Sequence, residues 1–131
     1  MANLTPPKPN RPSALTGYVD LANGRQRGLL TALKQQPLSV AITATREFQF
    51  YVSGIITQTT GASLNHAVLL FAALDTGATS TSYLTLKNSW GASWGEAGYM
   101  RFALDQSCNS AGALCAGVLN VNTAASYPTV S

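Results

Sequence analysis

The chain has 131 residues, of which 46% are hydrophobic and only 10% are charged, and its formal net charge is +3. This length corresponds to a single domain, and a domain of this size buries enough surface to fold without metal or disulfide staples. Two cysteines are too few for a disulfide framework. The longest apolar stretch, residues 67–74, is much shorter than the roughly 18 residues that cross a bilayer, so no membrane span is expected.

The charged fraction lies well below the roughly 25% of an average soluble domain. Two interpretations stay open: another domain or subunit covers the surface, or the surface is the neutral, Ser/Thr-rich exterior of a free monomer. Five of the cations lie before residue 35, but they are scattered and lack interleaved aromatic residues, so no nucleic-acid partner is expected. Residues 1–7 lack the apolar core of a secretory signal, and none is predicted.

Four of the six prolines lie within residues 6–12. Because proline fixes φ and lacks an N–H, residues 1–13 are predicted to form an extended, irregular arm, followed by one domain over residues 14–131. At the start of this domain, residues 17–21 alternate as a short strand does. Leu29, Leu30 and Leu33 then recur at helical spacing, which predicts an amphipathic helix over residues 25–35 that ends before Pro37.

From residue 38 onward the pattern has the period of two that is typical of strands. It predicts strands over residues 38–43, 48–52, 66–73, 83–87 and 98–103, with turns at 75–77 and 91–95. Several short strands with one helix indicate an α+β, mostly β domain. We expect an antiparallel sheet or open barrel with the helix packed at one end.

The single histidine, His66, would by itself be more typical of a structural side chain than of a catalyst. Two adjacent antiparallel strands can nevertheless place Asn88 beside it, so that the amide oxygen accepts a hydrogen bond from one ring nitrogen and fixes the imidazole's orientation. Trp90 would cover that bond from water. Taken singly, Asn88 and Trp90 are also typical of a turn cap and a core aromatic. The spacing of His, Cys and carboxylates predicts no metal site, and no cofactor is expected.

These residues belong to motifs that resemble the second, right-hand domain of the papain-like cysteine peptidases, in particular the papain and cathepsin L-like members. The resemblance spans about residues 14–128 and is carried by Asn65-His66-Ala67-Val68, Asn88-Ser89-Trp90-Gly91, Trp94-Gly95-Glu96 and Gly98-Tyr99, with supporting matches at 17–19, 29–33, 36–42, 48–55 and 124–128. It implies that His66 is the general base or thiolate partner, Asn88 its orienting amide and Trp90 the shield, in peptide hydrolysis through a covalent acyl-enzyme.

The resemblance also implies a substrate-binding wall. Ala41, Leu64, Ala67 and Ala124 match positions that line the pocket for the substrate's second residue from the scissile bond. Small apolar walls there would favour a hydrophobic substrate side chain. The family further suggests a lysosomal, vacuolar or secreted location.

The chain departs from the family in its nucleophile. The family's cysteine starts a helix of the left-hand domain, after a glutamine that donates to the oxyanion, and only the proline-rich arm precedes the right-hand domain here. Cys108 and Cys115 follow the Trp-Gly-Glu motif; Cys115 resembles a late structural cysteine of the family whose usual partner is missing. The two either pair across six residues or stay buried thiols. Phe71-Ala72-Ala73 stand where the family has glycines after the strand that follows the histidine. This replacement puts the local turn in doubt, but the strand is still predicted.

A thiolate and an imidazolium stabilise each other, and each is inert alone, so the isolated chain is expected not to cleave peptides. The favoured hypothesis is a pseudoenzyme half-domain that serves as a non-proteolytic structural or interaction subunit, with a protein partner on the face beside His66. The alternative is the right-hand chain of a two-chain cysteine endopeptidase, which would bind a peptide substrate once another polypeptide supplies Cys and Gln. A third hypothesis is an autonomous binder, such as an inhibitor or a peptide-holding domain.

Overall fold

The computed structural model describes residues 15–57, 63–109 and 115–130, and the predicted arm at residues 1–13 lies outside this part of the chain. Its strands and helices are, in chain order, β1 (Leu15–Asp20), α1 (Gln26–Leu33), β2 (Leu38–Ile42), α2 (Arg46–Gln49), β3 (Ile55–Ile56), β4 (His66–Leu74), β5 (Tyr83–Lys87), β6 (Tyr99–Ala103) and β7 (Ala125–Val130). Two short 3-10 turns, Gln106–Asn109 and Val118–Asn120, precede β7.

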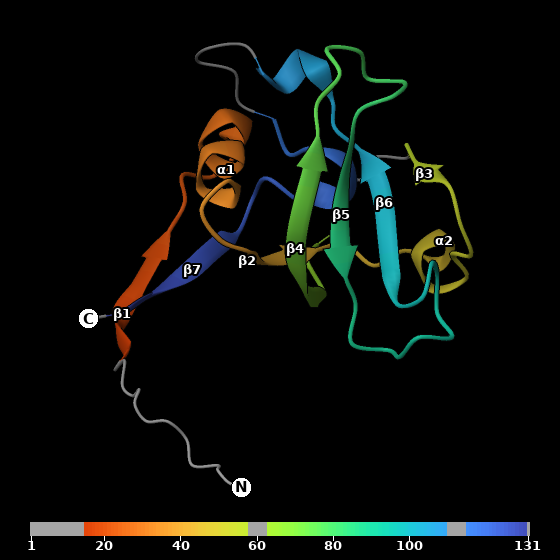
Figure 1. The fold of residues 1–131 in the computed structure, drawn as a ribbon, viewed down its shortest axis with the longest axis horizontal. Coiled ribbons are helices and arrows are strands. Elements are labelled where there is room, and N and C mark those ends of the chain that lie inside the picture. The colour runs from red at the N-terminus through yellow and green to blue at the C-terminus, as the bar shows by residue number, and fades with distance from the viewer. Residues whose placement is uncertain (1–14, 58–62, 110–114, 131) are drawn as a thin grey trace, which may run out of the picture.

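The strands form one seven-stranded sheet in the order β1-β7-β2-β4-β5-β6-β3 (Figure 1). Neighbouring strands are antiparallel except for β3 and β6, which run parallel. Helix α1 lies beside β4, and α2 lies at the opposite end of the sheet near β6. The mostly-β architecture confirms the predicted fold class. Among the described residues, no helix has the length and apolar character that crossing a bilayer requires.

One predicted strand is wrong. Residues 48–52, read as a strand both from their alternation and from the family resemblance, contain the end of α2 and an irregular turn. The reason is local: the Thr45 hydroxyl caps the helix by accepting a hydrogen bond from the backbone N of Phe48 at 3.2 Å, and Glu47 lies in the first turn. Burial of Phe48 inside the core then fixes this helical turn in place.

The strand after the histidine continues through the positions where glycines were expected. Strand β4 runs unbroken to Leu74, but its register with β5 shifts between Leu70 and Ala72, so that Phe71 is the extra residue of a β-bulge. The strand part of the prediction is confirmed. The bulge shows how the chain accommodates a bulky residue there.

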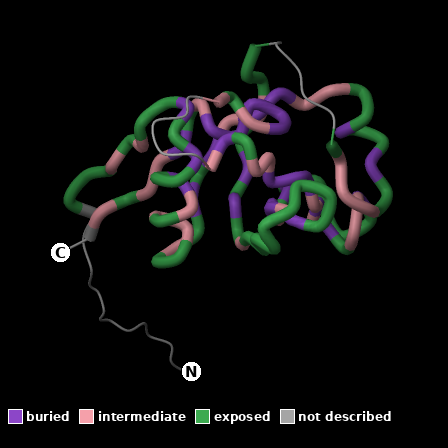
Figure 2. Tube along the Cα trace, turned by 90° about the horizontal axis from the view of Figure 1, so that it is seen from above, coloured by how far each residue is buried: buried purple, intermediate pink, exposed green. Residues whose placement is uncertain are grey.

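The core lies on the inner face of the sheet, where alternate residues of the central strands are buried (Figure 2). Val40, Leu70, Leu86 and Phe102 have at most 1% of their surface exposed. The period-two pattern of the sequence therefore selects the correct inward-facing residues. Helix α1 adds Leu29 to this core, as its apolar spacing predicted.

Both cysteines of the chain are used in one disulfide, Cys108–Cys115, with Cα atoms 5.6 Å apart. This settles the choice between a local pair and two buried thiols. Next to the bridge, the backbone N of Cys115 donates to the carbonyl of Gly24 at 2.9 Å. Gln26, which is buried, donates to the Asp105 carbonyl at 2.8 Å. The bridge is therefore anchored against the start of α1.

The cap of α2 generates a stability prediction. Thr45→Ala removes the hydroxyl acceptor and should lower the free energy of unfolding by about 1 kcal/mol, whereas Thr45→Ser keeps the acceptor and should lose much less. Urea unfolding followed by tryptophan fluorescence measures both variants. Equal losses in the two variants would mean that the methyl group, and not the cap, matters at this position.

Candidate active site

His66 and Asn88 meet because β4 and β5 are antiparallel. His66 is the first residue of β4 and Asn88 follows the last residue of β5, so both lie at the same end of the sheet. His66 Nε2 lies 2.9 Å from Asn88 Oδ1, the distance of a hydrogen bond. The predicted pairing of imidazole and amide is present in the structure.

The tautomer of His66 follows from a second hydrogen bond to the same oxygen. The backbone N–H of Ser89 donates to Asn88 Oδ1 at 2.8 Å, which identifies this atom as the acceptor oxygen. His66 Nε2 must therefore carry the hydrogen, and in the neutral ring Nδ1 keeps its lone pair. Within the described residues, no group hydrogen-bonds to Nδ1. The ring can accept a proton there.

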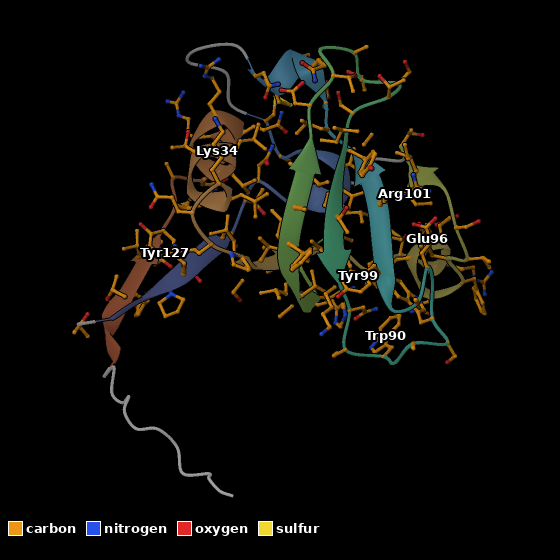
Figure 3. The ribbon with its side chains drawn as sticks, in the orientation of Figure 1. Lys34, Trp90, Glu96, Tyr99, Arg101 and Tyr127 are labelled. Carbon is orange, nitrogen blue, oxygen red and sulfur yellow. A yellow bond between two sulfur atoms is a disulfide. The ribbon has the colours of Figure 1, made fainter. Side chains whose placement is uncertain are left out.

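Trp90 lies against the imidazole, as the shield role requires. The two ring centroids are 5.0 Å apart at an interplanar angle of 32°, and Trp90 itself is 42% exposed. Figure 3 places Trp90 in the loop beyond the ends of β5 and β6. Asn88 is only 6% exposed. A buried amide limits competition from water for the hydrogen bond to His66.

Sequence reasoning missed Phe48, which packs edge-on against the rings of both His66 and Trp90. Its centroid lies 5.6 Å from that of His66 and 5.4 Å from that of Trp90. Trp94 completes the cluster and donates its indole N–H to the Phe48 carbonyl at 3.2 Å. Reading Phe48 as part of a strand hid this contact. The capping threonine three residues earlier was the signal that would have revealed it.

Three of the four predicted wall residues come together. Ala41 pairs with Ala67 across β2 and β4, and its backbone N donates to the Ala124 carbonyl at 3.0 Å. All three alanines line one groove of about 450 Å³. Leu64, which is 38% exposed, precedes β4 and does not line this groove.

The loop that follows Asn88 is held by an ion pair. Arg101 on β6 donates from Nε and Nη2 to the two oxygens of Glu96 at 2.9 and 2.8 Å (Figure 3). Glu96 also accepts from the Gly54 backbone N at 3.2 Å. The hydrogen bonds from Arg101 lower the pKa of Glu96 from 4.5 to about 2. The pair closes the loop that runs from Asn88 and Trp90 to β6.

The loop between β5 and β6 packs so tightly at Gly95 that no side chain would fit there. Gly95 also adopts φ +60°, which favours glycine. A Cβ atom there would lie 2.6 Å from the Tyr99 carbonyl oxygen and 2.9 Å from the Tyr51 ring. The Tyr51 hydroxyl meanwhile donates to the Gly54 carbonyl at 2.7 Å. In the Trp-Gly-Glu motif, the glycine is therefore needed because no side chain fits at its position, and the glutamate is needed because it pairs with Arg101.

Removal of the amide tests the orientation of His66. Asn88→Ala deletes the acceptor of the Nε2–H bond, so this proton should exchange quickly with water and its resonance should disappear from the NMR spectrum at neutral pH. Asn65→Ala, which alters the amide next to His66 in sequence, serves as the matched control and should keep the resonance. A protected Nε2–H signal in Asn88→Ala would show that Asn88 does not hold the ring.

The low pKa of Glu96 gives a pH prediction. Its pKa is depressed on folding, so its contribution to stability is present above about pH 5 and is lost as the pH falls toward 2. The melting temperature of Glu96→Gln should lie below that of the native chain at neutral pH, and the two values should converge in acid. Arg101→Lys, which keeps the charge but loses the two-pronged geometry, should fall between them. A pH-independent gap would contradict the ion-pair account.

The comparisons with known proteins agree with the geometry. The model of the family described as papain family cysteine protease matches residues 4–126. Fruit bromelain of Ananas comosus is 34% identical over 116 residues, which cover 88% of this chain and 31% of that protein. Cysteine protease XCP2 of Arabidopsis thaliana is 42% identical over 117 residues, covering 88% of this chain and 30% of that protein.

Solved structures give the same result. The bromelain protease from Ananas comosus, in complex with an inhibitor, superposes with a TM-score of 0.77 at 36% identity, over 89% of this chain and 51% of that one. Digestive procathepsin L 3 of Tenebrio molitor larval midgut superposes with a TM-score of 0.72 at 38% identity, over 88% of this chain and 35% of that one. The chain thus spans about a third to a half of these relatives. It belongs to the papain family of cysteine proteases and corresponds to their right-hand domain.

Proposed function

We propose that this chain supplies the imidazole half of a papain-type cysteine peptidase site, and that a thiol from another segment or polypeptide completes it. The observation that carries the proposal is the hydrogen bond of 2.9 Å between His66 Nε2 and Asn88 Oδ1, with Trp90 packed over the ring. A chain without a catalytic role would not need an imidazole oriented by an amide, with Nδ1 free of hydrogen bonds from the part of the chain that the structure describes.

The chain's own residues define what it contributes to peptide hydrolysis. His66 Nδ1 takes the proton of an incoming thiol, and the resulting imidazolium stabilises the thiolate. Asn88 holds the ring so that Nδ1 faces the reacting sulfur, and the same ring returns the proton to the leaving amine. Trp90 keeps water from the Nε2 bond.

The substrate class follows from the groove of Ala41, Ala67 and Ala124. Its alanine walls leave volume for a side chain and carry no charge themselves, which favours a hydrophobic substrate residue near the scissile bond; one charged residue, Asp20, also lines the groove. Leu64 is proposed as a further apolar contact from outside the groove. Three small side chains on neighbouring backbone segments give the substrate residue a shallow apolar contact surface.

A second candidate is a non-proteolytic structural or interaction subunit. It is favoured by the disulfide Cys108–Cys115, which uses both cysteines of the sequence and leaves the 131 residues without a thiol nucleophile. A charged fraction of only 10% also suits a surface that another protein covers. In this case a partner would pack beside His66 without presenting a cysteine.

A cysteine-directed epoxide distinguishes the two candidates. The full chain is purified with its bound companions and exposed to the probe, once as the native sequence and once each as His66→Ala and Gln49→Ala. The first proposal expects one labelled companion cysteine, with labelling reduced at least about a hundredfold in His66→Ala because the imidazole no longer activates the thiol. Gln49, exposed on α2, is the matched control and should leave labelling unchanged.

The other outcomes favour the alternative or overturn both. A stable complex without any reactive thiol supports the non-proteolytic subunit and sinks the peptidase half. Hydrolysis of a dipeptidyl reporter by the chain alone, abolished in His66→Ala, would contradict both candidates, since each holds that the 131 residues cannot act without a partner.

A further inference from the structure

A second cavity lies away from His66, between α1, the end of β4 and the 3-10 turn Gln106–Asn109. Its volume is about 510 Å³, within the range of roughly 300 to 1,000 Å³ typical of small-molecule sites. Figure 1 shows α1 beside the end of β4 that is farther from His66. None of its lining residues lines the groove of Ala41, Ala67 and Ala124.

Five of the residues that line this cavity are apolar. Leu30 and Leu33 line it from α1, and Phe71, Ala72 and Ala73 line it from β4. These three residues lie at the bulge of β4 and just after it, and the Phe71 ring also contacts Tyr99 of β6, with the ring centroids 5.9 Å apart. Phe71 remains 50% exposed although it is a large aromatic residue. The cavity therefore offers a hydrophobic surface that the fold itself leaves open.

Three charged residues also line the cavity and are called its rim here; they are two cations and one anion, Arg27, Lys34 and Asp75. Figure 3 shows Lys34 at the C-terminal end of α1, which it caps. The single ion pair of the described residues joins Glu96 and Arg101, so neither rim cation has a carboxylate partner there. Arg27 donates from Nη1 to the Asn109 carbonyl at 3.1 Å, which fixes its side chain at the rim.

Asp75 keeps its negative charge but forms no ion pair with these cations, because its oxygens accept hydrogen bonds from uncharged donors. Gln106 Nε2 and the Gly77 backbone N donate to Oδ1 at 2.7 and 3.0 Å, and Asn109 Nδ2 donates to Oδ2 at 3.2 Å. The hydrogen bond from Gln106 is the main cause that lowers the pKa of Asp75. The rim thus carries a net charge of +1, which suits one negative charge and disfavours several.

We propose that this cavity binds a medium-chain aliphatic monocarboxylate, with its carboxylate at Arg27 and Lys34 and its chain against Leu30, Leu33 and Phe71. A carboxylate matches the fork of Arg27 and satisfies the unpaired charge of Lys34. Burial of the chain removes apolar surface of ligand and protein from water. The site goes beyond the proposed peptidase function and needs neither His66 nor a thiol.

Octanoate is a suitable probe for the full chain. In a titration of the ¹⁵N-labelled protein, we expect saturable amide shifts at residues 30–34, 71–73 and 109, and none at Ala41 or Ala124. Octanol, which lacks the carboxylate, tests the role of the charge. Acetate tests the need for the aliphatic chain, and inorganic phosphate tests the preference for a single negative charge. Octanol, acetate and phosphate should each bind more weakly than octanoate.

Charge variants of one helix provide the decisive comparison. Lys34→Gln should weaken octanoate binding by about threefold, whereas Arg25→Gln removes the same charge from the exposed start of α1, outside the cavity, and should change affinity much less. Ala73→Trp should abolish binding by filling the cavity. If it does not fold, the Lys34 and Arg25 pair still decides.

Three results would overturn the proposal. These are equal binding of octanol and octanoate, equal effects of Lys34→Gln and Arg25→Gln, and the absence of saturable shifts at millimolar octanoate. Preferential binding of an acidic peptide with the same shifts would assign the cavity to a protein partner instead. None of these results depends on peptidase activity, so the proposed function stands or falls separately.

Discussion

The antiparallel pairing of β4 with β5 is the constraint on which the site depends. It brings the start of one strand and the end of the other to one edge, and thereby sets His66 Nε2 at 2.9 Å from Asn88 Oδ1 although the two residues are 22 positions apart in the sequence. A register shift of one residue would point one of the two side chains to the opposite face. The buried residues Leu70 and Leu86, which face each other in this pair, prevent such a slip.

The loop between β5 and β6 carries both the Asn88 amide and the Trp90 indole that packs on His66, and two different kinds of force position this loop. The first is packing: Trp94 of the loop lies against Phe48 of α2, with ring centroids 5.0 Å apart. Glu96 and Arg101 hold it by charge where it joins β6. Asn88 Nδ2, which is buried, has no hydrogen-bond partner among the described residues. An unpaired buried donor costs about 1 to 3 kcal/mol, and such costs are typical of functional sites.

Much of this arrangement could be predicted from the sequence, because period-two burial and specific motifs carry it. The strands that begin at Leu38, His66 and Tyr83 and the pair of His66 with Asn88 follow from these patterns. Helix α2 could not be read from alternation, since Phe48 satisfies a strand pattern and a capped turn equally well. The Glu96–Arg101 pair and the cavity beside α1 also escaped, because they depend on side chains that meet only after folding. The roles of Ala41, Ala67 and Ala124 in substrate binding remain predictions.

The Cys108–Cys115 bridge has a chemical consequence for any assembly that this chain joins. Because both of its sulfurs are oxidised, every free thiol in such an assembly belongs to another molecule or segment. A thiolate nucleophile acts only in its reduced form, whereas the bridge exists only in its oxidised form. Reducing conditions therefore favour the thiolate, and oxidising conditions favour the bridge. The bridge closes only a short loop, and the entropy it removes from the unfolded chain is correspondingly small. A functioning assembly would therefore need a redox poise that lies between the potentials of its two kinds of sulfur.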